Sequence, residues 1–443
     1  MQEIPRYFRA QFTDRFINFV RGTGEMMIQM ELEFNSRLDI DRLSKALDLT
    51  LDAEPVLGCR FVKRWWRPYW ERLDAGNRNV LTIAEDARAY ERFKGAPIDP
   101  YIGPQIKACL LRRTDRDHLL IKVAHEVSDA SALKQIVGTI SSTYSVLAHD
   151  PEYQPEPNIY GDRSIWQVLR HVPWHAYPNI LYDYYAVYTI PCLFPFVSIH
   201  LPVVADDDRT LEYISRTVHE DSLKNIIEYG RQRNGTLNDV LVAAFFHAIA
   251  ATSDWDHKSQ LRLRLTIDLR RFKPDGNGGG VCNLSGMELV DLGNDLNDNF
   301  DYTLKRISSF MRQRKARWIG IHDYIGLAPL ITLFPHRVMK NILVRIIRSG
   351  MEIGNDALVV TNMGAIEQQD VNFDIPPVEA RLLPPVDYPP HIIFCFTTYN
   401  GSLNISAGSW PCSKRYIDRC LDEMIVVLNG LSSEKAADTA YAA

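Results

Sequence analysis

A buried-strand pattern that runs directly into a helix pattern most constrains the fold of this chain. Residues 119–124 form an apolar run with β-branched side chains, which is typical of a core strand. Apolar residues then repeat at helical spacing and predict a helix over residues 131–147: Leu133, Ile136, Val137 and Ile140. His125 ends the strand and Asp129 precedes the helix. The end of a rigid element is a good place to hold a general base.

The His-x-x-x-Asp spacing is not specific by itself. The chain has 12 histidines, so about one such spacing is expected by chance. A strand-end histidine beside an aspartate that caps a helix explains the same residues without any catalysis, because Asp favours the capping position. Other parts of the sequence are therefore needed to decide between a catalytic and a purely structural role for His125.

Length and composition favour a globular protein of two subdomains. With 443 residues, 46% hydrophobic and 24% charged, the chain exceeds one ordinary core. Its net charge of −5 does not suggest nucleic acid as a partner. Seven cysteines are dispersed singly, without a Cys-x-x-Cys pair, so we expect no metal site and a reducing, cytoplasmic setting. Residues 1–20 lack the unbroken apolar core of a signal peptide. We expect a monomer.

One segment complicates this interpretation. Residues 184–204 carry no Asp, Glu, Lys or Arg and are long enough to span a bilayer. Pro191, Pro195 and Pro202 disfavour a regular spanning helix. We interpret the segment as a buried connection between two halves, with peripheral membrane contact left open. The same question arises for two basic amphipathic helices, expected over residues 306–317 and 335–347, which we interpret as solvated outer faces.

Strand and helix patterns alternate through two halves of the chain. In the first half we expect strands over residues 25–34, 58–63, 106–112 and 118–123, and a helix over 40–51 capped by Asp39. Residues 150–164 are rich in proline and polar groups and look like a linker. In the second half we expect strands over residues 211–219, 261–269, 281–290, 357–361, 392–397 and 402–407. The helices expected there, besides the two basic ones, cover residues 222–233, 237–251 and 416–428.

The junction reads Ala124-His125-Glu126-Val127-Ser128-Asp129-Ala130, and five other segments stand around it in order. They are residues 38–47, 54–61, 236–244, 267–271 and 360–364. Together they resemble the chloramphenicol acetyltransferase-like superfamily, whose signature is His-His-x-x-x-Asp-Gly. That group includes condensation domains of nonribosomal peptide synthetases, alcohol O-acetyltransferases and polyketide-associated acyltransferases. The resemblance covers nearly the whole chain.

This resemblance implies an α/β fold of two acetyltransferase-like subdomains with mixed sheets and a substrate tunnel between them. The N-terminal subdomain would cover residues 1–164 and carry the motif. Residues 165–209 would form the aromatic, proline-rich connection, and residues 210–443 the C-terminal subdomain.

The resemblance also implies roles for single residues. His125 matches the catalytic base, and an imidazole suits proton removal near neutral pH. Asp129 matches a structural aspartate held by an arginine of the second half, which we assign to Arg270, with Arg271 as the alternative. Candidate donors to the oxyanion, or tunnel residues, are Ser285, Asn283 and Thr361, which ordinary strand polarity explains equally well. Glu126 is expected to be a solvated or pocket-rim carboxylate.

Two residues depart from the signature. Ala124 replaces the first histidine, which is generally not the base, so its loss alters packing behind His125 rather than removing the chemistry. Ala130 replaces the glycine, and we expect its methyl group either to narrow the tunnel mouth or to block the close approach of the backbone to a bulky thioester arm.

Three functions therefore remain open. The first is an acyltransferase that moves an acyl group from acyl-CoA to an alcohol or amine, with no bound cofactor. The second is a stand-alone condensation enzyme whose donor is a phosphopantetheinyl thioester on a carrier protein. The third is a catalytically silent binding protein with this fold. Gly-x-Ser-x-Gly and His-Glu-x-x-His are absent, which disfavours a serine hydrolase and a zinc protease.

Overall fold

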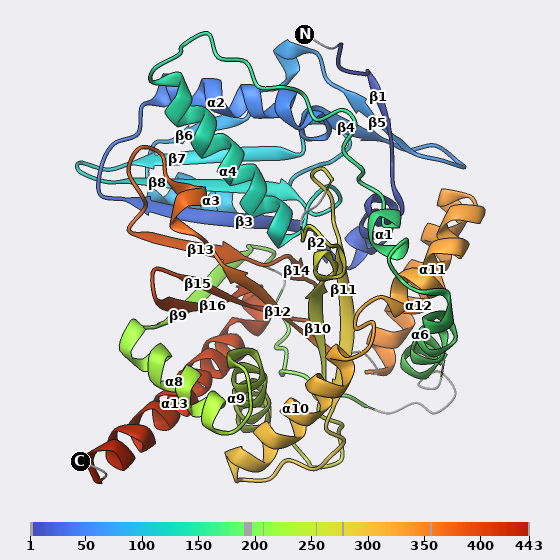
Figure 1. Ribbon diagram of the computed structural model, residues 1–443, viewed down its shortest axis with the longest axis vertical. Helices are drawn as coiled ribbons and strands as arrows, with labels where there is room; N and C mark the ends of the chain where they lie inside the picture. The colour runs from blue at the N-terminus through green and yellow to red at the C-terminus, as the bar shows by residue number, and fades with distance from the viewer. Residues whose placement is uncertain are drawn as a thin grey trace.

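The computed structural model describes residues 3–189, 197–206, 208–253, 255–276, 279–354 and 357–441. Two α/β halves lie one above the other in Figure 1, each built around its own mixed sheet and its own core. The sheet of the first half has the order β13-β3-β8-β7-β6, and that of the second half β11-β10-β12-β15-β16-β9.

Strands of the first sheet alternate between two buried faces. Ile28, Met30 and Leu32 of β3 point into the main core of this half, whereas Glu31 between them pairs with Lys94 of α3 on the opposite face. Helices α2 and α4 cover the core face. The elements of this part are β3 (Met27–Phe34), α2 (Ile40–Ala53), β6 (Leu81–Ala84), α3 (Ala87–Gly95), β7 (Ile106–Arg112), β8 (Asp117–Ala124) and α4 (Ala130–Leu147).

A small antiparallel sheet, β1-β5-β4, extends this half at its edge. Its strands are β1 (Tyr7–Arg9), β4 (Cys59–Val62) and β5 (Tyr69–Arg72). Helix α1 (Phe12–Val20) follows β1 and lies near the second half.

The second half packs helices α8, α9, α10 and α13 against its sheet. Helix α9 is apolar on almost every side, and the sheet and neighbouring helices bury it accordingly. The strands are β9 (Glu212–Val218), β10 (Arg262–Asp268), β11 (Ser285–Asp291), β12 (Leu358–Ala365), β15 (Ile393–Tyr399) and β16 (Ser402–Ser409). The helices are α8 (Glu220–Gln232), α9 (Leu237–Thr252), α10 (Phe300–Lys315) and α13 (Pro411–Tyr441).

A segment of the second half completes the sheet of the first. Strand β13 (Glu379–Leu383) pairs antiparallel with β3, and Arg381 Nε lies 2.7 Å from Glu31 Oε2. Strand β14 (Val386–Asp387) then pairs with β2 (Gly24–Glu25). No sequence pattern indicated this crossover. The proposed boundaries at residues 164 and 209 stay a prediction.

The connection between the halves is only partly buried. It holds α5 (Trp166–Leu169) and α6 (Tyr177–Tyr184), and residues 190–196 of the aromatic segment lie outside the described residues. Ile180, Ile199 and Leu201 are buried in the second core, whereas Tyr182 is exposed. Helices α11 (His322–Leu333) and α12 (His336–Ile353) lie beside α6 at the right of Figure 1. Within the described residues, no single helix has the length and apolar character to cross a membrane, and only α8 and α9, bent by 99°, pass that test as a pair.

Candidate active site

His125 lies just after β8, where the two halves meet. Its backbone N–H donates to Met26 O at 3.0 Å, which fixes the backbone beside the start of β3. The chain then turns, and the ring Nδ1 comes to 2.7 Å from Ser128 O. From the second half, Asn283 Nδ2 donates to His125 O at 3.4 Å.

These contacts select one form of the His125 ring. A carbonyl only accepts hydrogen bonds, so Nδ1 carries a proton and donates to Ser128 O. Burial lowers the pKa of His125 below its usual value, although the Ser128 carbonyl and Asp129 act in the opposite direction. The ring is therefore neutral at pH 7, and Nε2 holds the lone pair that a general base requires.

Asp129 connects the turn to the second half. Its Oδ1 accepts from Ala132 N at 2.8 Å and thereby caps α4. Its Oδ2 accepts from Leu284 N and from Arg270 Nη1, both at 2.7 Å. The side chain is buried, so these bonds satisfy a carboxylate that water does not reach.

Arg270 is the arginine that reaches Asp129. It follows β10, and its Nη1 also lies 3.2 Å from Asp268 Oδ1, while Nη2 donates to Cys282 O at 3.1 Å. Burial opposes the charge of Arg270, but Asp129 and Asp268 outweigh it and raise its pKa. Burial alone would likewise raise the pKa of Asp129, and the Arg270 guanidinium brings it below the usual value. Arg271, the alternative partner, is exposed to solvent.

The three oxyanion candidates lie in different surroundings. Asn283 contacts His125, and its Oδ1 accepts from Ser285 N at 3.0 Å. Ser285 begins β11 and accepts from the Tyr324 hydroxyl at 2.6 Å through its carbonyl. The Thr361 hydroxyl is 2.7 Å from that of Thr266 on the neighbouring strand. The structure thus brings Asn283 to His125, and Ser285 beside Asn283, whereas Thr361 bonds within its sheet.

Glu126 differs from what the sequence suggested. The expectation of a solvated or pocket-rim carboxylate was wrong, because the side chain is fully buried. Arg21 binds it in bidentate fashion, with Nε at 2.7 Å from Oε1 and Nη2 at 2.9 Å from Oε2. A buried carboxylate needs such a partner, but Arg21 is more than a hundred residues away in sequence, so no local pattern could have found the pair.

The two residues that depart from the signature, Ala124 and Ala130, lie in regular secondary structure on either side of the turn. Ala124 is fully buried, and its N–H donates to Gln105 O at 2.8 Å. Ala130 is the first residue of α4. Both positions carry methyl side chains beside His125 and Asp129, where the signature has a histidine and a glycine.

A cavity of about 780 Å³ lies where α4 faces residues 365–370 of the second half. Ser131, two residues after Asp129, lines it and donates to Asp268 Oδ2 at 2.6 Å. Lys134 also lines it and donates to the carbonyls of Met363 and Ala365, each at 3.0 Å. This cavity is thus bounded by both halves, close to the Asp129–Arg270 pair.

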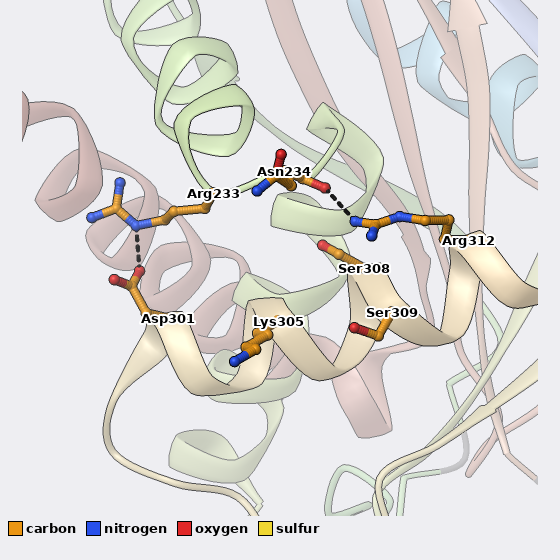
Figure 2. Close-up of a pocket in the computed structure, with 7 residues that line it drawn as sticks. All are labelled: Arg233, Asn234, Asp301, Lys305, Ser308, Ser309 and Arg312. Carbon is orange, nitrogen blue, oxygen red and sulfur yellow. Dashed lines mark hydrogen bonds and ion pairs between the residues drawn. The ribbon is translucent and has the colours of Figure 1, made fainter.

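A second cavity, of about 320 Å³, lies on the outer side of the second half (Figure 2). There Arg233 Nε is 2.6 Å from Asp301 Oδ1, and Arg312 Nη2 donates to Asn234 O at 3.0 Å. Its lining residues all come from the α8–α9 turn and α10, so it is separate from the His125 motif.

The fold is that of peptide synthetase condensation domains, and an epimerization domain of tyrocidine synthetase B shares it. The first condensation domain of the CDA synthetase has a TM-score of 0.67 and 14% identity, covering 95% of this chain and 96% of that one. Polyketide synthase associated protein 5 from Mycobacterium tuberculosis has a TM-score of 0.63 and 12% identity, covering 95% of this chain and 98% of that one.

A nonribosomal peptide synthetase, FmoA3, matches with a TM-score of 0.68 and 14% identity. That match covers 98% of this chain but 45% of the synthetase chain, so this chain spans less than half of that protein. No protein-family model and no curated protein sequence matches this chain. At such identities the likeness establishes the fold, which confirms the predicted two-part α/β architecture.

Replacing Asp129 with alanine tests the buried ion pair. The change leaves the Arg270 guanidinium without its main partner and removes the cap of α4, so we expect about 3–5 kcal/mol less free energy of unfolding. Denaturant unfolding followed by circular dichroism measures it. Asp422→Ala is the control, because Asp422 also pairs with an arginine, Arg216, but its side chain is 61% exposed, and should cost about 1 kcal/mol or less. Equal losses in both variants would contradict the role of the buried pair.

Proposed function

We propose that this protein is an acyltransferase that moves an acyl group from acyl-CoA to an alcohol or amine, with His125 as the general base. The fold supports an acyl-transfer or condensation role. The observation that carries the finer proposal is the neutral His125 ring, whose Nδ1 is tied to Ser128 O and whose Nε2 is left as the acceptor.

In the proposed reaction, the acceptor hydroxyl or amine attacks the thioester carbonyl carbon while Nε2 takes its proton. A tetrahedral oxyanion forms, and its collapse breaks the carbon–sulfur bond. The departing thiolate receives the proton from the imidazolium, which regenerates neutral His125. The products are an ester or amide and the free thiol, so no oxidant or bound cofactor is needed.

The turn between β8 and α4 would keep the base in position. Asp129 holds the turn through α4 and Arg270, so side-chain motion of His125 is limited by both halves at once. The base itself contributes about 10²–10⁴-fold in rate. The remainder must come from holding the two substrates together and from donors to the oxyanion, for which Asn283 is the nearest of the three candidates.

The cavity beside α4 is the proposed entrance for the thioester. It opens between the halves near Asp129, and the Lys134 ammonium at its wall suits the phosphates of coenzyme A. Burial lowers the pKa of Lys134, although nearby acidic groups act in the opposite direction. Both backbone carbonyls that Lys134 contacts belong to the second half, so the cation is fixed where the halves meet.

Two alternatives keep specific support. The condensation-domain fold suits a stand-alone condensation enzyme that takes its acyl group from a carrier protein. A catalytically silent binding protein is supported by Ala124 and Ala130 in place of the signature histidine and glycine.

Thiol release from a panel of acyl-CoA donors, with mixed alcohols and amines, tests the proposal. We expect turnover that depends on the acceptor and that falls about 10²–10⁴-fold in His125→Ala, because the base is lost. His149→Ala removes an exposed histidine near the end of α4 and should leave turnover unchanged.

Equal turnover in His125→Ala and the wild type would refute the role of His125. Absence of turnover with every acyl-CoA, followed by transfer from an acylated carrier protein, would favour the condensation enzyme. Ligand binding without turnover from either donor would favour the silent binding protein.

The pH dependence of kcat/KM provides a separate test. The base works only without its proton, and burial lowers the pKa of His125 below the usual value of 6.5. With an alcohol acceptor, which does not itself titrate in this range, we therefore expect the midpoint of the acidic decline in kcat/KM to lie below pH 6.5. A midpoint above pH 7 that is kept in His149→Ala but lost in His125→Ala would show that the pKa of His125 is raised, and it would contradict this environment.

A further inference from the structure

Helix α12 has one apolar face that the fold buries and another that it leaves exposed. Met339 and Leu343 pack with Phe19 of α1 in a small core. Val338, Ile342 and Ile346, spaced four residues apart, are 39%, 45% and 57% exposed. They form a stripe along the helix that nothing in the described structure covers.

Two tryptophans extend this stripe at the start of the helix. Trp65 and Trp66 lie in the turn between β4 and β5 and are 59% and 46% exposed. Their carbonyls accept from the backbone N–H groups of Arg337 and His336, at 3.4 and 3.0 Å, respectively. The hairpin is thereby attached to the helix, at the right of Figure 1. Phe334, just before α12, is also exposed.

Arginines surround these apolar side chains. Arg64, Arg67, Arg337, Arg345 and Arg348 are all exposed, and none has an ion pair within the part of the chain that the structure describes. Residues 63–70 and 334–351 contain no Asp or Glu, although the whole chain has a net charge of −5. Positive charge is therefore concentrated on this surface against the overall balance.

We propose that this surface, formed by the β4–β5 hairpin and helix α12, binds the headgroup region of a bilayer that contains anionic phospholipid. Arginines bind phosphate oxygens through two N–H groups at once. Tryptophan is the side chain that favours the boundary between headgroups and acyl chains. A helix with an apolar stripe between basic residues lies flat in that boundary.

The same features disfavour a second copy of this chain as the occupant. A two-fold contact through this surface would place the five arginines of one copy against those of the other. Against them the surface offers two carboxylates, Glu352 at the end of α12 and Glu71 of β5, and Glu71 already pairs with Arg60. An acidic protein would neutralise the charge, but two adjacent exposed tryptophans and a continuous aliphatic stripe suit the acyl-chain boundary better.

Docking would also orient the active site. Helix α12 contacts the turn after α1, where a Cβ added at Gly22 would lie 3.8 Å from Val344. The neighbouring Arg21 holds Glu126, the residue after His125. The contacts that connect helix α12 to His125 are therefore the packing of Val344 beside Gly22 and the ion pair between Arg21 and Glu126.

Vesicle co-sedimentation tests the proposal and requires no turnover, so its outcome is independent of the proposed acyl transfer. We expect the full chain to sediment with phosphatidylglycerol-containing phosphatidylcholine vesicles, and much less with phosphatidylcholine alone or at high salt. The double variant Ile342→Asn/Ile346→Asn should bind at least about tenfold less, because both side chains are exposed and insert into the bilayer.

Val426→Asn is the matched control. Val426 is an exposed aliphatic residue of α13, which is not part of the proposed surface, so this variant should bind vesicles as well as the wild type does. Circular dichroism and the unfolding midpoint establish that each variant is folded. Equal binding by the double variant and the control would overturn the proposal, as would a wild type that stays in the supernatant. Failure to bind vesicles together with tight binding of an acidic carrier protein that Ile342→Asn/Ile346→Asn abolishes would assign the surface to a protein instead.

Discussion

The buried ion pair between Asp129 and Arg270 is the interaction on which the remainder of the site depends. Two charges taken out of water are costly unless their other hydrogen-bonding atoms are satisfied. Here Ala132 N and Leu284 N complete the carboxylate, while Cys282 O and Asp268 Oδ1 complete the guanidinium. Every one of these partners lies in the turn, in α4 or in the facing edge of the second half. The turn that carries His125 is therefore held by groups from both halves.

The sequence contained most of this fold because its elements are periodic and well capped. The predicted strand over residues 106–112 matches β7, and Asp39 caps α2 as expected, with Oδ1 3.0 Å from Arg42 N. Strand β13 was missed because it is five residues long and has its partner, β3, more than three hundred residues earlier. Its pairing depends on contacts such as Arg381 with Glu31, which no local pattern encodes.

The residues of the candidate site were also predicted only in part. The strand-to-helix junction predicted that His125 and Asp129 would be neighbours, and the resemblance supplied Arg270, which the structure places on Asp129. Glu126 was misjudged because its burial follows from Arg21 and the packing of α1. The basic helix expected over residues 335–347 was interpreted as a solvated face. Its exposed aliphatic stripe and the adjoining tryptophans became visible only once the fold showed which side of α12 was already occupied.

The protonation state of the His125 ring is the most direct test of this description. ¹⁵N NMR of histidine-labelled protein at neutral pH, with His125→Gln used to assign the signal, distinguishes the two neutral forms and the imidazolium. We expect a proton on Nδ1, which donates a hydrogen bond to Ser128 O, and none on Nε2. A proton on Nε2, or a charged ring at neutral pH, would mean that His125 cannot take a proton from an acceptor, and the proposed chemistry would be wrong.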